Sequence, residues 1–206
     1  MVIPKCNSFL LVFLTIMILT NYLSAQVSLG LQGGLNISKV DLNNEIVQSQ
    51  ISSINSFTFG AIINYKLNSI ISLQSELRYL RSGNEQNMGG NEIIIDHFDY
   101  LEIPIYAIAE LPNSFISPFA LVGINMGYLL KATQKYHFHN SDFTEYFNKS
   151  NFSIDVGLGV KHSFYKNIWV QFSSRYSFGM YSLDKEHVDG RKTRGIQILL
   201  GVLYNI

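Results

Sequence analysis

Hydrophobic and polar residues alternate along most of the chain, which is the pattern of β-strands that present two different faces. The final segment shows this most clearly, because every even position from Ile196 to Ile206 is aliphatic or aromatic. Most odd positions between them are small or polar, among them Gln197, Gly201 and Asn205. Seven earlier segments repeat the period of two, at approximately residues 27–37, 57–67, 71–79, 100–107, 120–130, 152–161 and 168–180. No helical period competes over comparable lengths, so the pattern predicts eight strands.

The connections between these segments alternate strictly in length, long first and then short. The three short ones are rich in turn-forming residues and lie at 68–69, 112–114 and 165–167. The four long ones are polar and lie at approximately 38–53, 84–92, 132–150 and 183–192. Short periplasmic turns and longer external loops are typical of outer-membrane barrels. We therefore expect an all-β protein, an eight-stranded antiparallel up-and-down transmembrane β-barrel.

The N-terminal segment has a different character. Lys5 is its only charge, and an apolar stretch at 9–19, interrupted by one threonine, precedes the small residue Ala25. A basic start, a short apolar run and a small residue before a polar one are typical of a secretory signal peptide. The apolar stretch is shorter than the roughly 20 residues that a spanning helix needs. We expect residues 1–25 to be a cleaved signal peptide and residues 26–206 to form the barrel domain.

Composition narrows the class of protein. Charged residues make up 15% of the chain, against about 25% in typical soluble domains, while aromatic residues reach 13%. The formal net charge is zero, which gives no reason to expect a nucleic-acid partner. The only cysteine, Cys6, lies in the predicted signal peptide, so the mature domain has no disulfide framework. An exported, apolar chain of this kind fits the cell outer membrane, with membrane lipid as its partner.

The polar face of the predicted strands is rich in glycine and serine, and it also carries charges of both signs. In a soluble barrel such as a lipocalin this face would be exposed, and long Lys and Glu side chains should dominate it. Small residues suit the narrow, packed lumen of an eight-stranded barrel, so the arrangement favours a membrane barrel without an open pore. We expect the charges to form an interior polar network of Glu76, Arg78, Glu102, Asp155, Lys161 and Arg175. A proton or ion path through the lumen is the alternative interpretation.

The fourth predicted strand carries a motif, because Tyr100–Ile105 reads Tyr-Leu-Glu-Ile-Pro-Ile. This motif resembles a strand common in PorT-like and related outer-membrane β-barrel proteins of Bacteroidetes. The early strand that contains Gly33-Gly34-Leu35-Asn36 is similar to that group too. The resemblance implies an outer-membrane location and a barrel of this type. Because the name-giving members are linked to protein secretion and gliding, it also implies an alternative role as a component of a secretion or envelope-assembly system.

The C-terminal segment resembles the signal that the barrel-assembly machinery recognises in outer-membrane proteins. Gly201, Tyr204 and Ile206 supply the glycine, the aromatic residue and the final hydrophobic residue of that pattern. The segment departs from the pattern because it ends in isoleucine instead of phenylalanine, and because Leu199 stands where a polar residue is usual. A lipid-facing strand would show the same apolar alternation. On this resemblance, the barrel-assembly machinery is an expected partner during biogenesis.

The third long connection is the best candidate for an interaction surface outside the cell. The expected surface residues are Tyr136, His137, Phe138, His139, Phe143 and Tyr146, and Phe147 is a further aromatic residue of this connection. Aromatic residues at barrel rims commonly lie at the level of the lipid headgroups, so membrane anchoring and binding of a protein partner are equal interpretations. We expect a non-enzymatic protein with a structural or binding role through its extracellular loops.

A rim-based enzyme is the remaining alternative. Asp96, His97 and Asp99 lie near the end of the fourth predicted strand. A hydrolase would also need a nucleophile beside such a base and acid, and no motif in the sequence shows that assembly. The pair His137 and His139 could point two rings the same way, yet the spacing fixes no third metal ligand. The glycines follow strand alternation and do not form a phosphate-binding loop. We therefore expect no catalytic residues, no metal and no cofactor.

Overall fold

A computed structural model describes residues 26–41, 51–89, 92–112, 115–136, 139–180 and 192–206, so the predicted signal peptide lies outside the described residues. The described chain contains one turn of 3-10 helix, η1 Thr144–Tyr146, and nine strands: β1 Gln26–Asp41, β2 Ile51–Lys66, β3 Ile71–Gly89, β4 Glu92–Glu110, β5 Ile116–Tyr136, β6 His139–Asp142, β7 Ser150–Tyr165, β8 Ile168–Gly179 and β9 Lys192–Asn205. Apart from β6, the strands have 12 to 21 residues. A tilted strand needs only about 9–11 residues to cross a membrane.

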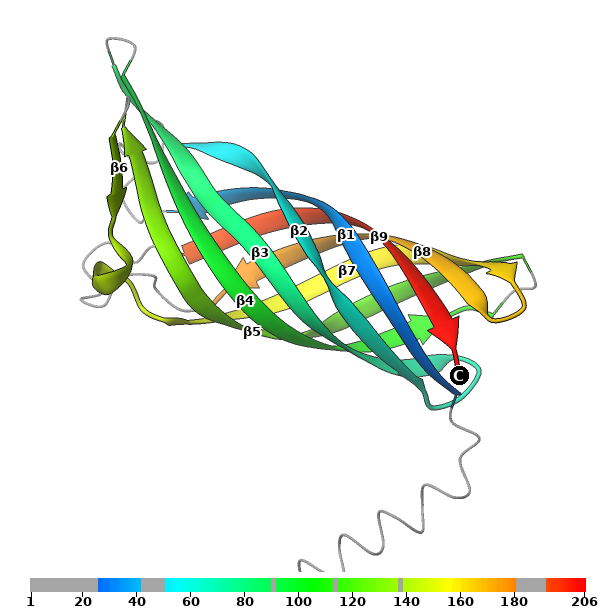
Figure 1. Cartoon of the computed structure of the whole chain (residues 1–206). Helices are drawn as coiled ribbons and strands as arrows, with labels where there is room; N and C mark the ends of the chain where they lie inside the picture. Colours follow the sequence, from blue (N-terminus) through cyan, green and yellow to red (C-terminus); the bar gives the residue numbers. More distant parts are fainter. Residues whose placement is uncertain (1–25, 42–50, 90–91, 113–114, 137–138, 181–191) are drawn as a thin grey trace, which may run out of the picture.

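The eight long strands close into an antiparallel barrel in which each one pairs with the long strands before and after it (Figure 1). The first and last strands complete the ring, since β1 pairs with β9 in a register that sets Leu31 opposite Val202. The short strand β6 pairs only with the end of β5. The predicted eight-stranded all-β barrel is therefore confirmed. Within the described residues, the molecule has no helix of the length and apolarity needed to cross a membrane.

The outer wall is apolar and the lumen is largely polar, because alternate residues of each strand face opposite sides. On β1, for example, Leu29, Leu31 and Leu35 are exposed on the outer wall. Gln32 and Asn36, which follow Leu31 and Leu35 directly in the sequence, are buried in the lumen. Exposed aliphatic and aromatic residues continue over the other long strands. An apolar outer wall on a closed barrel is the band that contacts lipid.

The short connections β2–β3, β4–β5 and β7–β8 lie at the same end of the barrel (Figure 1). Because short turns are periplasmic in outer-membrane barrels, we call this the periplasmic end and the opposite one the extracellular end.

At the extracellular end, the prediction of long loops is partly wrong. Where a loop is predicted at 84–92, β3 runs to Gly89 and β4 begins at Glu92, which leaves two residues outside the strands. Likewise β5 continues to Tyr136, inside the predicted loop 132–150, and β1 and β2 both extend into the predicted loop 38–53. Polar residues mark the end of the lipid-facing band, but their backbones still pair, so the strands continue beyond it. Most of the predicted loop 183–192 lies outside the described residues.

A β-bulge near the extracellular end of β5 changes which residues face the lumen. Asp99 of β4 lies opposite Lys131, but the next residue, Tyr100, lies opposite Leu129, so Leu130 is an extra residue. Beyond the bulge the alternation of β5 is shifted by one position. Ala132 is therefore buried, although strict alternation from the middle of the strand would expose it.

Candidate functional site

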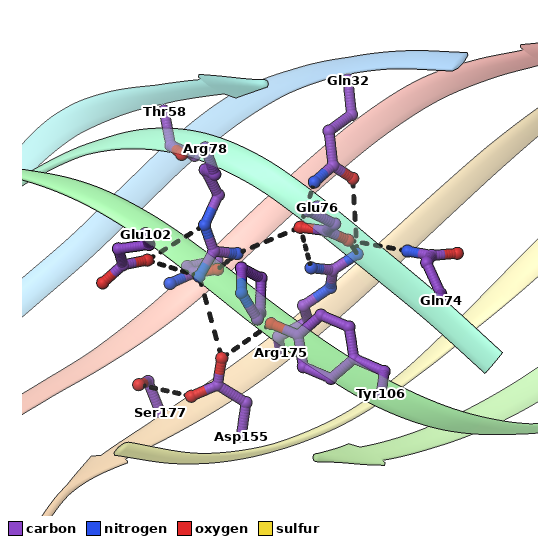
Figure 2. A network of polar contacts seen from close by, with 12 residues as sticks. Gln32, Thr58, Gln74, Glu76, Arg78, Glu102, Tyr106, Asp155, Arg175 and Ser177 are labelled. Carbon is purple, nitrogen blue, oxygen red and sulfur yellow. Dashed lines mark hydrogen bonds and ion pairs between the residues drawn. The ribbon is translucent and has the colours of Figure 1, made fainter. Parts of the chain in front are cut away.

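The centre of the lumen holds a network of charged and amide side chains (Figure 2). Strand alternation places Gln74, Glu76 and Arg78 of β3 on the inner face, where all three are buried. Side chains from other walls meet them, and the network joins β1, β3, β4, β7, β8 and β9. The ring of strands is therefore cross-linked through its interior as well as through its backbone.

Glu76 is held by donors from three sides. Arg175 of β8 binds both carboxylate oxygens, with Nη1 at 3.0 Å from Oε2 and Nη2 at 2.8 Å from Oε1. Gln74 Nε2 donates to Oε1 at 2.7 Å, and the side-chain amide of Gln32 donates to Oε2. Arg78 adds a second cation, with its Nη1 at 3.6 Å from Oε2. A buried carboxylate is costly unless it is paired and hydrogen-bonded, and these four residues supply both kinds of contact.

Arg78 links this group to two further carboxylates, those of Glu102 and Asp155. Its Nη2 lies 2.6 Å from Glu102 Oε2 on the neighbouring strand, and 3.8 Å from Asp155 Oδ2. Its Nη1 donates to Gln197 Oε1 of β9 at 2.7 Å. The network thus contains two guanidinium groups and three carboxylates, all of them buried.

Asp155 of β7 is held by hydroxyl groups. Tyr106 Oη donates to its Oδ2 at 2.7 Å, while Ser177 Oγ and Ser153 Oγ lie 2.6 Å and 3.0 Å from its Oδ1. The guanidinium of Arg175 also lies over the Tyr106 ring, with its Cζ 4.7 Å from the ring centroid. This cation–π contact connects the Asp155 hydroxyls to the Glu76 group.

The structure places five of the six residues predicted for the interior network side by side: Glu76, Arg78, Glu102, Asp155 and Arg175. Lys161 does not lie with them, and this part of the prediction is corrected. Its Nζ lies 3.1 Å from Glu110 Oε2, near the periplasmic end. Lys161 and Asp155 share the inner face of β7, but they are six positions apart along the strand, which is about 20 Å.

The uncharged members of the network were not predicted from the sequence, and they include Gln32, Gln74, Tyr106, Ser153, Ser177 and Gln197. The sequence does hold a signal for them. Each lies at an alternate position of its strand that faces the same side as the charged residues, and all but the part-buried Ser177 are buried. Their polar atoms complete the hydrogen bonding of the buried charges.

An apolar layer lies in the lumen on the extracellular side of the network. It consists of the buried residues Val40, Leu80, Phe98, Tyr100, Leu129 and Ala132, with Phe147 packed against them. The rings of Phe98 and Phe147 meet edge to face, with 4.9 Å between their centroids. We call these seven residues the apolar plug.

Residues 139–147 form an arm that folds back along the end of β5. Its strand β6 pairs with β5, with Thr133 opposite Asp142. The backbone of Ala132 then holds the following turn, because its N–H donates to Thr144 Oγ1 at 2.9 Å and its carbonyl accepts from Phe143 N–H at 3.0 Å. These bonds bring Phe147 to the apolar plug.

Asp142 fixes the turn between β6 and η1. Its Oδ1 accepts hydrogen bonds from the Thr144 hydroxyl at 2.6 Å and from the Thr144 backbone N–H at 3.0 Å. Both stabilise the charged form, the hydroxyl more strongly, so the pKa of this exposed carboxyl lies below its ordinary value.

A pocket of about 180 Å³ lies between the arm and the end of the barrel, and we call it the rim pocket. It is lined by Asp96, Phe98, Ala132, Thr133, Gln134, Phe143, Tyr146 and Phe147. Phe143 and Tyr146 of the predicted interaction surface therefore line it, whereas Tyr136 is exposed at the end of β5. The backbone of His139 pairs with that of Tyr136, and His137 and Phe138 lie outside the described residues.

The residues considered for a rim-based enzyme do not converge. Asp96 accepts hydrogen bonds from the side-chain amides of Asn84 and Gln134, at 3.4 Å and 2.9 Å. Asp99 forms an ion pair with Arg81, with 2.6 Å between Oδ1 and Nε. Alternation directs His97 away from the face of Asp96 and onto that of Asp99, whose carboxylate is engaged by Arg81. In the described parts of the chain, no three His, Cys, Asp or Glu residues form a group that could hold a metal ion.

The predicted assembly signal lies on β9 and the residue after it. Tyr204 and Ile206 are exposed on the outer wall, and Gly201 is buried on the inner one, where an added Cβ would lie 3.2 Å from Gln171 Cγ. This placement suits a lipid-facing closing strand. Recognition by the assembly machinery stays a prediction.

Together, the closed ring, the apolar outer wall and the packed polar lumen define a small outer-membrane barrel. Residues 23–185 match the family described as outer membrane protein beta-barrel domain, and the chain belongs to this family. Membership supports an outer-membrane location. The narrower PorT-like resemblance and cleavage of the signal peptide stay predictions.

Solved barrels share the fold. The chain is 15% identical to neisserial surface protein A, with a TM-score of 0.53 over 85% of this chain and 96% of that one. For the outer membrane protein OprG from Pseudomonas aeruginosa the identity is 9% and the TM-score 0.51, over 87% and 95%. For a major outer membrane protein from Thermus thermophilus the identity is 7% and the TM-score is 0.57, over 89% of this chain and 100% of that one. At these identities the likeness shows the fold alone. No match was found among curated protein sequences.

Proposed function

We propose that this protein is a non-enzymatic outer-membrane barrel with a closed lumen, and that it acts by binding a ligand at its extracellular rim. The observation that carries the proposal is the rim pocket, which the arm forms against the barrel end. An arm held by backbone hydrogen bonds at Ala132 keeps the pocket in place without a bound partner. Preorganisation of this kind lowers the entropic cost of binding.

The interior supports the closed lumen. The charge network cross-links the walls at the centre, and the apolar plug lies on its extracellular side. In an eight-stranded barrel the interior is only wide enough for packed side chains. A role in passive transport therefore has little space to operate, and binding at the rim is the better supported function.

The lining of the rim pocket favours a small aromatic cation. Phe143, Tyr146 and Phe147 supply aromatic walls, and aromatic faces attract cations. Asp96 supplies a carboxylate whose partners within the described chain are amide groups, with no ion pair to a basic side chain. A ring with an attached ammonium group would satisfy both features.

Two probes of similar shape and opposite charge test this proposal: phenethylamine and phenylpropionate. Binding is measured by titration calorimetry of the refolded protein in maltoside micelles, with empty micelles subtracted. We expect saturable binding of phenethylamine and much weaker binding of phenylpropionate. The variants Phe143→Ala and Tyr146→Ala should both weaken phenethylamine binding.

A matched control lies on the same strand as the pocket. Tyr128→Ala removes an exposed aromatic side chain from the outer wall of β5 and should leave binding unchanged. The proposal is wrong if the two probes bind alike, or if Tyr128→Ala weakens binding as much as the pocket variants do.

A further inference from the structure

A second cavity, of about 50 Å³, lies in the mouth of the barrel at the periplasmic end. Its lining comes from the ends of strands that meet at this mouth: Ser28, Asn64, Lys66, Glu110, Lys161, Trp169, Leu203 and Asn205. A water molecule needs about 10–15 Å³ of such space, so the cavity has room for a few waters or for one small tetrahedral ion. It is separate from the rim pocket, which lies at the other end of the molecule.

The charges in this cavity do not balance. Lys161 is buried, and its ammonium group is paired with Glu110 at 3.1 Å. The same ammonium lies 5.2 Å from the centroid of the Phe119 ring. Lys66 supplies a second ammonium, for which the described part of the chain offers no ion-pair partner. Two ammonium groups and one carboxylate leave a net charge of about +1 in a partly enclosed space.

A neutral donor in the same cavity is also unsatisfied. The indole Nε1 of Trp169 is buried and has no hydrogen-bond partner among the described residues. Of the buried polar atoms in that condition, it is the one that belongs to a residue lining this cavity. A buried donor without an acceptor is unfavourable. An acceptor bound in the cavity would satisfy it.

We propose that this cavity binds one small oxyanion of the phosphate class. Lys66 and the Lys161–Glu110 pair supply the positive field, and the Trp169 N–H supplies a directed donor. Free phosphate in the periplasm and the phosphate of a phospholipid headgroup in the periplasmic leaflet are two sources of this chemistry.

Trp169 makes the site measurable, because it is the only tryptophan of the chain. Refolded protein in maltoside micelles is titrated with sodium phosphate at constant pH and ionic strength, with chloride as the exchanged anion. We expect a saturable change in Trp169 fluorescence with phosphate. Phosphorus NMR of the same samples should show broadening of the phosphate line. A response no larger than that of chloride would mean that the cavity holds only water, and would overturn the proposal.

Two lysine variants at the same end separate a site from general surface attraction. Lys66→Gln removes the unpaired ammonium and should weaken phosphate binding by about tenfold, or about 1.4 kcal/mol. Lys166→Gln removes an exposed charge from the β7–β8 turn, outside the cavity, and should change nothing. Equal losses in the two variants would contradict the proposal. Retention of the folded form on unheated gels shows that each variant is intact.

Reconstitution identifies the source of the anion. In vesicles of phosphatidylglycerol and phosphatidylethanolamine, a headgroup ligand would give the phosphate-saturated fluorescence before any phosphate is added. A free ligand would require added phosphate in vesicles as in micelles. If Lys66→Gln alters neither response, the proposal fails for both sources.

Discussion

Glu76 and Arg175 join opposite walls of the barrel. Around the ring, three strands separate β3 from β8 in either direction, so their ion pair crosses the lumen along a diameter. The two residues are 99 positions apart in the sequence, and the pair uses both oxygens of the carboxylate. Because β3 and β8 are not paired in the sheet, this contact links two walls that share no backbone ladder.

Breaking this pair from one side should destabilise the fold strongly. Arg175→Met leaves Glu76 with Arg78 as its remaining cation, at 3.6 Å. Loss of one partner of a buried pair costs about 3–5 kcal/mol, and we expect the free energy of unfolding to fall by that amount. The double variant Glu76→Leu with Arg175→Met should recover most of the loss, because the uncompensated carboxylate is removed as well. Urea unfolding in vesicles, followed by Trp169 fluorescence, measures both.

The Arg81–Asp99 pair is the control for this experiment. It has similar geometry, but the Arg81 side chain is 34% exposed. Arg81→Met should therefore cost only about 0–1 kcal/mol. If Arg175→Met costs no more than Arg81→Met, the lumen network does not stabilise the barrel.

Two glycines on the same face of β5 should respond differently to a methyl group. At Gly123 an added Cβ would lie 2.0 Å from the Ile105 carbonyl oxygen and 2.7 Å from Tyr106 Cδ1. At Gly127 the nearest atoms would lie 3.5 Å away, which is ordinary contact. Gly123→Ala should reduce the yield of folded barrel, and Gly127→Ala should not. The fraction of protein that migrates as the compact form on unheated gels measures the yield. Equal yields for the two variants would show that the close contact at Gly123 does not limit folding of the barrel.

The arm should loosen in acid. The Thr144 hydrogen bonds hold the pKa of Asp142 below its ordinary value, so their stabilising effect is present above that value and is lost as the pH falls through the lowered pKa. The Thr144 amide resonance should titrate with this lowered pKa in NMR spectra of the protein in nanodiscs. Asp142→Asn should abolish the titration. A Thr144 amide that titrates unchanged in Asp142→Asn would assign the effect to another group.

The strands and their faces could be predicted from the sequence, because period-two alternation records which side of each strand meets lipid. On β1, Leu31 and Gln32 lie on the predicted sides. The strand ends could not be predicted in the same way. Beyond the membrane a run of polar residues fits a paired strand as well as a loop. The extension of β3 to Gly89 could therefore not be predicted from the pattern.

The candidate sites depended on information that alternation does not carry. Alternation showed that Lys161 faces the lumen, but it does not give the level of a residue relative to those on other strands, and Lys161 lies beside Glu110 and away from the central charges. The rim pocket depends on the bulge at Leu130, which shifts Ala132 to the inner face, and on the folding back of the arm. Neither the extra residue nor the return of Phe147 to Phe98 has a periodic signal.

Single-channel recording in planar lipid bilayers tests the closed lumen most directly. The purified, refolded protein is inserted at high salt, and insertion is verified by the heat-shifted gel mobility of protein recovered from matched vesicles. A porin in the same membrane provides the positive control. Because the charge network and the apolar plug close the lumen at its centre and on the extracellular side, we predict no conductance steps above the baseline. Sustained, ion-selective steps from the folded protein would contradict this account.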